Sequence, residues 1–482
     1  RLAEAGREVI LLEEGEYVPP NELNENESEL MPRLFADQCY RATDDAAVSV
    51  LQGATVGGGT TVNWMVMLRT PDHVLEEWGR RFGLTEFSAA KMAPIFARIE
   101  REVHARPVPD DAHSPANRVI LDGANKLGWR ASASLINAKG CVRAGSCSLG
   151  CRYEAKQGAL QTYLPRAFAK GARLFANTGV SRVDVIERDS GTGAPPRKRV
   201  HATVRDPITR APRASVTVDA PVVILAGGAV GTPSILQRSG FGGGAVGRFL
   251  RLHPTSVVFG VYNRELYPFA GTPLSATCDH FNAHDDRGYG FWIQIPGLQP
   301  ALASAATPGF GAAHRERMKK IRNCAPLITL VRDGSDVERS SGSVTVDRSG
   351  RAKLSYRLSP RDAANMRAAI AAGARLHLAN GALEIMTLHD TPIVIKTERD
   401  LDQLTRASMA PNDLSLFSAH VNGTCRMGTD ASISGATPDG QRRGVRGLYV
   451  FDGSLLPTGL GVNPQETIMG VVTVLAERLA AH

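Results

Sequence analysis

The clearest periodic pattern in the chain lies near its carboxyl-terminal end. Apolar residues recur there at the three- and four-residue spacing of one helix face: Ile468, Val471, Val472, Leu475 and Leu479. Immediately before this pattern, Asn463, Pro464 and Glu466 stand at positions typical of an N-cap, a first helical residue and a capping-box acid. The pattern therefore predicts a final helix that begins just after Asn463.

Shorter patterns predict further elements. Residues 1–6 read as the end of a helix that stops at a glycine, and residues 7–12 as a strand that ends before Glu13. Residues 343–347 and 353–357 alternate apolar and polar side chains and predict a hairpin, and residues 362–380 predict a helix that Gly381 ends.

Composition is that of a large folded protein. With 482 residues, of which 43% are hydrophobic, the chain can bury a substantial core and is expected to form two domains. No apolar run reaches the roughly 18 residues of a membrane-spanning helix. The net charge of +8 is dispersed, and the basic segment 195–199 reads as a solvated hairpin loop rather than a nucleic-acid patch.

Two polar residues in the final block suggest chemistry on an alcohol. His420 could accept a hydroxyl proton while the carbon gives up hydride, and Asn463 could hydrogen-bond the developing alkoxide. Both residues also have structural interpretations, because Asn463 suits a helix cap and a histidine is often structural. From the residues alone, these alternatives stay open.

Several motifs together resemble the glucose-methanol-choline family of flavin-dependent oxidoreductases. They are residues 53–63, 222–233, 418–428, 447–457 and 461–464. Residues 222–233 resemble the strand and turn that precede a helix in the family's dinucleotide domain. The resemblance implies that His420 accepts the proton, that Asn463 fills the second active-site position and that hydride passes to flavin N5. It also implies that FAD is contacted by Glu13, Gly53, Thr55, Gly57, Gly58, Asn63, Val180, Ala226, Gly227, Asp452, Gly453 and Pro464.

The motifs also suggest how the chain is divided. We expect a Rossmann-like, α/β FAD-binding domain built from residues 1–70, 131–250 and 411–482. The intervening residues 71–130 and 251–410 are expected to form an α+β substrate domain, with an antiparallel sheet capped by helices. His253 and Pro254 also fit the family pattern, and His253 is expected to pack or to form hydrogen bonds.

The first residues suggest that part of the cofactor site is missing. Glu13 matches the family's ribose contact, but neither the first strand nor a G-x-G-x-x-G turn precedes Arg1. We therefore expect a truncated chain in which FAD binding is doubtful, with an inactive flavin-free fragment as one alternative. Val62 stands where some relatives carry a histidine bonded to the flavin, which implies a noncovalent cofactor.

Three of the seven cysteines lie close together, at positions 141, 147 and 151. Cysteines at short spacing can bind a metal or an iron-sulfur cluster. This segment resembles the long-chain alcohol oxidase branch of the family, in which a fourth cysteine stands at the position of Ala144. Because only three thiols are present, we expect no metal site, and either packing thiols or one disulfide.

The sequence thus predicts an FAD-dependent alcohol oxidase or dehydrogenase that uses oxygen or a quinone as electron acceptor. A long-chain or other hydrophobic alcohol is the expected substrate, because residues 289–296 could line an apolar channel, although core packing explains them equally well. A hydroxynitrile lyase on the same fold is an alternative from another class. Because the expected N-terminus is absent, export cannot be judged, and the cytoplasm is the favoured location.

Overall fold

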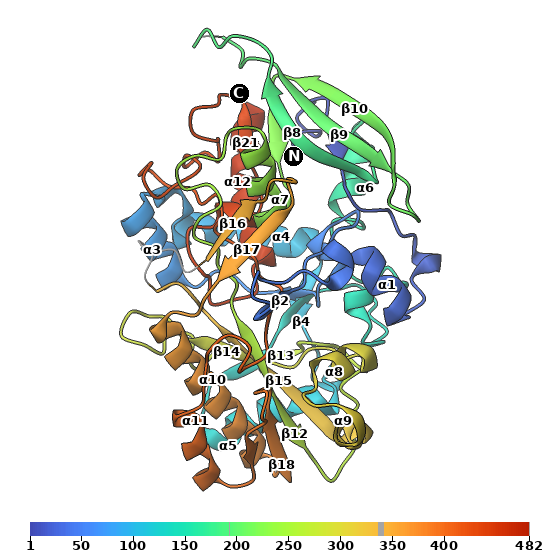
Figure 1. Ribbon diagram of the computed structural model, residues 1–482, viewed down its shortest axis with the longest axis vertical. Helices are drawn as coiled ribbons and strands as arrows, with labels where there is room; N and C mark the ends of the chain where they lie inside the picture. Colours follow the sequence, from blue (N-terminus) through green and yellow to red (C-terminus); the bar gives the residue numbers. More distant parts are fainter. Residues whose placement is uncertain (192, 336–341, 482) are drawn as a thin grey trace.

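The computed structural model describes residues 1–191, 193–335 and 342–481 as a mixed α/β protein with several sheets (Figure 1). The helices have these bounds: α1 (Glu27–Leu34), α2 (Gly59–Val62), α3 (Asp72–Phe82), α4 (Ala89–Glu102), α5 (Pro115–Leu127), α6 (Tyr163–Phe168), α7 (Gly228–Arg238), α8 (Pro300–Ala306), α9 (Gly311–Lys319), α10 (Pro360–Ala379), α11 (Asp402–Thr405) and α12 (Gln465–Ala481).

A nine-stranded sheet occupies the lower half of Figure 1 and is mostly antiparallel. Its strands are β2 (Val48–Val50), β5 (Ala131–Ala133), β12 (Thr255–Val261), β13 (Ala276–Cys278), β14 (Phe291–Gln294), β15 (Cys324–Val331), β18 (Glu384–Thr387), β19 (Val394–Ile395) and β20 (Leu416–Ser418). Helices α5 and α10 pack on it, so the central strand β15 is buried along its whole length. This is the antiparallel sheet capped by helices that the sequence predicts.

The upper half contains parallel strand pairs of the kind found in dinucleotide-binding domains. They are β1 (Ile10–Leu12) with β7 (Arg173–Phe175), and β11 (Val223–Leu225) with β21 (Leu448–Val450). Three smaller sheets complete the fold: β8 (Thr178–Val185), β9 (Lys198–Arg205) and β10 (Pro212–Ala220); β3 (Val66–Met67), β4 (Ala105–Pro107) and β6 (Leu135–Asn137); and β16 (Gly342–Val346) with β17 (Ala352–Tyr356).

The two halves are not separated cleanly along the sequence. Strands β2, β5 and β20 come from segments expected in the flavin domain, yet they pair within the large sheet. Strand β20 lies between β2 and the start of β12, and therefore ties the two halves together just before His420. The five-segment division stays a prediction, and the site lies where these strands meet.

Most predicted elements are confirmed. Strand β11 leads into α7, the hairpin forms as β16 and β17, and the final helix forms as α12. Helix α10 begins at Pro360, and the hydroxyl of the N-cap residue Ser359 accepts a hydrogen bond from Asp362 N–H at 3.1 Å. It ends before Gly381, whose φ of +75° suits a residue without a side chain.

Two local predictions are wrong in part. Residues 1–6 form turns rather than the end of a regular helix. The segment 195–199 is not wholly a solvated loop, because Lys198 begins β9 and its side chain is fully buried. The Lys198 ammonium donates to the carbonyl oxygens of Pro196 and Pro221 at 2.7 and 2.8 Å, which satisfies it inside the protein.

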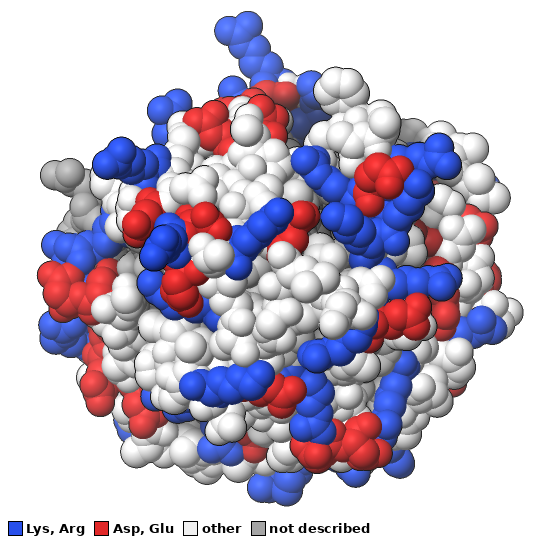
Figure 2. Space-filling model, turned by 90° about the horizontal axis from the view of Figure 1, so that it is seen from below, with Lys and Arg blue, Asp and Glu red and all other residues white. Residues whose placement is uncertain are grey.

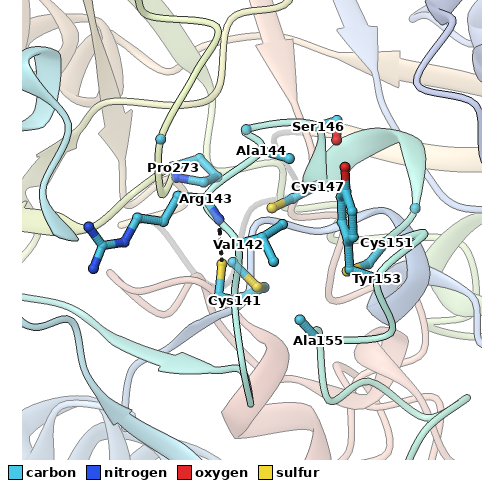
Figure 3. A pocket seen from close by; sticks show the side chains of 14 residues that line it. Cys141, Val142, Arg143, Ala144, Ser146, Cys147, Cys151, Tyr153, Ala155 and Pro273 are labelled. Carbon is cyan, nitrogen blue, oxygen red and sulfur yellow. Dashed lines mark hydrogen bonds between the residues drawn. The ribbon is translucent and has the colours of Figure 1, made fainter.

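The three neighbouring cysteines line a hollow beside Tyr153 and Pro273 (Figure 3). All seven cysteines of the chain are free, so the predicted alternative of one disulfide is wrong. In the described ranges, no group of three or more His, Cys, Asp or Glu residues is arranged to hold a metal ion. Nor does any helix in that part of the chain have the length and apolar character to cross a membrane.

The cap of α10 offers a test of the fold. Ser359→Ala removes the acceptor for Asp362 N–H and should cost about 0.5–2 kcal/mol of unfolding free energy, measured by denaturant titration. Ser355→Ala is the control, because Ser355 is exposed on β17, and its effect should stay within about 0.5 kcal/mol. Equal effects of the two substitutions would contradict the assigned cap.

Candidate active site

The two candidate catalytic residues lie together although 43 positions separate them in the sequence. His420 follows β20, and one residue, Pro464, separates Asn463 from the start of α12. Asn463 Nδ2 lies 3.5 Å from His420 Nε2. The strand and the helix start therefore bring an imidazole and an amide to one point, as the sequence predicts for the pair.

The side chain of Asn463 does not cap α12. Its amide pairs with the amide of Gln294 at the end of β14, donating to Oε1 at 3.2 Å and accepting from Nε2 at 3.1 Å. Glu466 forms no capping box either, since its buried carboxyl faces Glu100 and Arg69. Burial and the Glu100 carboxyl raise the pKa of Glu466. The capping interpretation is therefore wrong, and Asn463 points into the site.

A second histidine supports His420. His253 Nδ1 lies 3.4 Å from His420 Nδ1, and His253 Nε2 accepts a hydrogen bond from Leu460 N–H at 2.8 Å. The backbone of His253 has a φ of +44°, which is uncommon for a residue with a side chain. The Asp333 carboxylate holds it there by accepting the N–H groups of Leu252 and His253, each at 3.1 Å. His253 is thus the hydrogen-bonding histidine that the sequence predicts.

The two imidazoles are kept neutral by their surroundings. Burial, and then the neighbouring His253, hold the pKa of His420 well below its ordinary value. Burial, together with the nearby Arg332 guanidinium, lowers the pKa of His253 to about 3. The Trp292 indole lies parallel to the His420 ring at 6.2 Å between centroids, so an apolar surface flanks the pair. A neutral imidazole in such a place can exchange a proton with a bound hydroxyl.

The predicted ribose contact, Glu13, and two further residues predicted to bind FAD, Thr55 and Val180, lie at or near the end of β1. Glu13 follows this strand, and its carboxylate accepts a hydrogen bond from Gly15 N–H at 2.8 Å. Burial raises the pKa of Glu13 to about 7. Thr55 lies nearby, because its hydroxyl donates to Glu16 O at 2.8 Å. Val180, on β8, belongs to a strand that lies beside β1.

The predicted glycine loop forms a close turn before α2. Gly57 and Gly58 have positive φ values of +88° and +53°. A side chain on Gly53 would come within 2.8 Å of the Gly58 carbonyl oxygen. These glycines are not fully buried, so their backbone remains open to a ligand. The loop therefore suits close approach of a planar ring or a phosphate.

Asn63 joins this loop to α12. Its amide donates to the side chain of Gln465, one residue after Pro464. Lys156, which the sequence analysis did not single out as functional, donates to the carbonyl oxygens of Thr61, Asn63 and Cys147. Its buried ammonium therefore links the flavin loop to the cysteine segment.

The remaining predicted residues lie around the start of α7. Ala226 and Gly227 follow β11 and are exposed. Asp452 accepts hydrogen bonds from Gly228 N–H at 2.9 Å and Thr232 Oγ1 at 2.5 Å, while its other oxygen binds Ser454. Burial nevertheless raises its pKa. Gly453 packs against the segment that carries His420, so Asp452 and Gly453 connect α7 to the reactive pair.

These groups fit FAD. An acid at the end of a parallel strand, an open glycine turn and exposed backbone at the end of a second parallel strand are groups that bind ribose, phosphate and ring edges. Glu13, Gly57 and Gly227 occupy those places. The buried pair His420 and Asn463 supplies the polar groups that would face the reacting end of the cofactor.

Sequence reasoning missed Gln294 as a member of the site. It lies within the apolar run 289–296, which the structure shows to be buried core, with Tyr289, Phe291 and Trp292 each 1% exposed. The signal available in the sequence was a glutamine within an apolar run, because an amide buried there requires hydrogen-bond partners. Its partners, Asn463 and Thr277, can be identified only in the folded structure.

The amide pair gives a direct prediction for Asn463. Asn463→Asp replaces the donor to Gln294 Oε1 with a carboxylate oxygen, so two acceptors would face each other in a buried place. The substitution should cost about 1–3 kcal/mol of unfolding free energy, as expected for a buried hydrogen bond that is lost. Chemical denaturation of both proteins measures this difference. An aspartate variant as stable as the parent would restore the capping interpretation.

Comparison with known proteins agrees with this geometry. The chain matches the two models of the GMC oxidoreductase family, over residues 31–255 and 338–471. It is 31% identical to an uncharacterized GMC-type oxidoreductase of Mycobacterium tuberculosis, covering 100% of this chain and 73% of that protein. The solved structure of pyridoxine 4-oxidase from Mesorbium loti has the same fold, with a TM-score of 0.71, 16% identity and coverage of 100% and 97%.

A long-chain-alcohol oxidase of Arabidopsis thaliana is 29% identical over 99% of this chain, which spans 65% of that protein's length. The family matches fall on both halves of the fold, and the second match includes His420 and Asn463. Together these findings show that the chain belongs to the GMC oxidoreductase family.

Proposed function

We propose that this protein oxidises an alcohol with FAD as the hydride acceptor, and that the substrate is a long-chain or otherwise hydrophobic alcohol. The observation that carries the proposal is the contact between a neutral imidazole, His420, and a buried amide, Asn463. The relative named as a long-chain-alcohol oxidase supports the choice of substrate. The apolar surface of Trp292 beside His420 suits the same class.

His420 is proposed to hold the hydroxyl of the alcohol and to accept its proton at Nε2, the nitrogen that faces Asn463. Asn463, whose amide is held by Gln294, would donate an N–H hydrogen bond to the substrate oxygen as negative charge develops on that oxygen. When bound, FAD supplies the ring that takes the hydride from the alcohol carbon. The protein itself would hold the substrate in position and provide a polar pocket from which water is excluded.

The cofactor would be held by residues on both sides of the reactive pair. Glu13 would bind the ribose, the backbone of Gly57 and Gly58 would approach the flavin, and Ala226 and Gly227 would face the dinucleotide. We propose noncovalent binding, because Val62 at the end of α2 carries no nucleophile. Oxygen or a quinone is proposed as the acceptor that restores the oxidised cofactor.

An anaerobic screen tests the proposed reaction. The FAD-loaded protein is mixed with primary alcohols of increasing chain length, and flavin absorbance is followed. Long-chain alcohols should bleach the flavin, and mixing with oxygen or with a quinone then identifies the acceptor. Cleavage of a cyanohydrin without bleaching would instead support a lyase, and a protein that binds no FAD would contradict the proposal for this chain.

The role of His420 is tested by removing the imidazole. His420→Ala should retain FAD but slow anaerobic flavin reduction roughly 10²-fold or more, the usual loss for a positioned acid-base group. His314→Ala, on the exposed helix α9, is the matched control and should reduce at the parent rate. If His420→Ala also reduces at the parent rate, another group accepts the proton.

The lowered pKa of His420 predicts an unusual dependence on pH. A histidine base with the ordinary pKa of about 6.5 would become protonated and lose activity as the pH falls through that value. Because burial lowers the pKa of His420, the base stays neutral there, and the rate of flavin reduction should remain constant from pH 8 to below 6.5. Stopped-flow reduction measures the profile. A tenfold loss centred near pH 6.5 would contradict the buried, neutral imidazole.

A further inference from the structure

Helices α8 and α9 form a hairpin at the edge of the large sheet, at the lower right of Figure 1. Phe310 lies in the turn between them, and 90% of it is exposed. Gly309 and Gly311, with φ values of +96° and +60°, flank Phe310 and shape the turn. The chain therefore holds a large apolar side chain out in the solvent at this turn.

The residues that follow Phe310 are strongly basic. Residues 311–322 contain five cationic side chains and one acidic one: Arg315, Arg317, Lys319, Lys320 and Arg322, with Glu316. Glu316 pairs with Lys319 at 2.7 Å, and Lys320 lies 3.6 Å from Glu384. Within the described ranges, Arg315 and Arg322 have no acidic partner. Figure 2, seen from below, shows Lys and Arg side chains spread over this end of the molecule, with Asp and Glu side chains among them.

The inner side of the hairpin has a different character. It covers a hollow with a mostly apolar lining that includes Phe259, Leu298, Met318, Ile321 and Met386, and Arg317, Lys320 and Glu384 lie at the same hollow. The hairpin thus rests on the sheet through apolar contacts, while no residue of α9 itself is buried. Because the core beneath is already covered, the exposure of Phe310 is not explained by packing within the chain.

We propose that the α8–α9 hairpin docks this protein on an anionic lipid bilayer, with Phe310 inserted at the headgroup boundary and the basic residues facing the lipid phosphates and carboxylates. An exposed aromatic side chain at a turn, followed along the chain by arginines without acidic partners, has the chemistry that binds such a surface. A bilayer also dissolves hydrophobic alcohols, so docking would bring the protein to the source of the proposed substrate. The docking itself does not depend on the proposed reaction.

Vesicle sedimentation tests the proposal. The purified protein should sediment with phosphatidylcholine vesicles that contain phosphatidylserine, and much less with phosphatidylcholine alone. Each basic residue near an anionic surface contributes about a fivefold increase in affinity, so Arg315→Glu with Arg322→Glu should weaken binding by well over an order of magnitude. Phe310→Ser should weaken binding severalfold, and added salt should reduce the effect of the charges.

Two controls match these variants. Ile208→Ser removes an apolar side chain that is 89% exposed in the turn between β9 and β10, outside the α8–α9 hairpin. Arg188→Glu with Arg348→Glu changes the net charge by the same amount on other exposed loops. Both controls should sediment like the parent protein, and all variants should keep the parent's circular dichroism and melting temperature.

Three results would overturn the proposal. The first is absence of binding to the anionic vesicles, and the second is equal loss in the hairpin variants and the controls, which would indicate only diffuse charge. The third comes from size-exclusion chromatography. If the parent forms a dimer that Phe310→Ser dissociates, the hairpin contacts a second copy of the chain rather than a membrane.

Discussion

Burial of the polar groups around His420 is the constraint on which the rest of the site depends. A polar group removed from water must find a partner or lose free energy, and here the partners of the side chains of His253 and Asn463 come from distant segments. Gln294 on β14 pairs with Asn463, and Leu460 N–H binds His253. Asp333 holds the backbone of His253. The site therefore forms only when the large sheet, the loop before β12 and the start of α12 are all in place.

The same constraint explains why the reactive imidazole is neutral. His420 and His253 lie too close together, and too far from water, for either to hold a proton easily. Arg332 adds its charge against protonation of His253, while its own charge is balanced by Glu77, 2.5 Å away. The Arg332–Glu77 ion pair therefore lies close to the histidine pair and helps to keep it neutral. That neutral state is the one that the proposed transfer of a proton from an alcohol requires.

The cofactor loop and the cysteine segment are joined by a single buried cation. Lys156 donates to the carbonyl oxygens of Thr61 and Asn63 on one side and of Cys147 on the other. Burial lowers its pKa to about 8, but the three carbonyl groups satisfy its hydrogens. The cysteines therefore belong to a structural support for the flavin loop, with free thiols packed around the hollow of Figure 3.

The sequence by itself determined the local elements and the family. Periodicity predicted α10, α12 and the β16–β17 hairpin, because each depends mainly on neighbours in the chain. Motifs identified His420 and Asn463 but left Asn463 between two roles. Only the tertiary structure decided that its amide faces Gln294 rather than the backbone of α12. The partner lies 169 residues away, and local spacing carries no information about contacts at that separation. The sequence also suggested a solvated Lys198 and a capping Glu466. Only the tertiary structure decided that both side chains are buried.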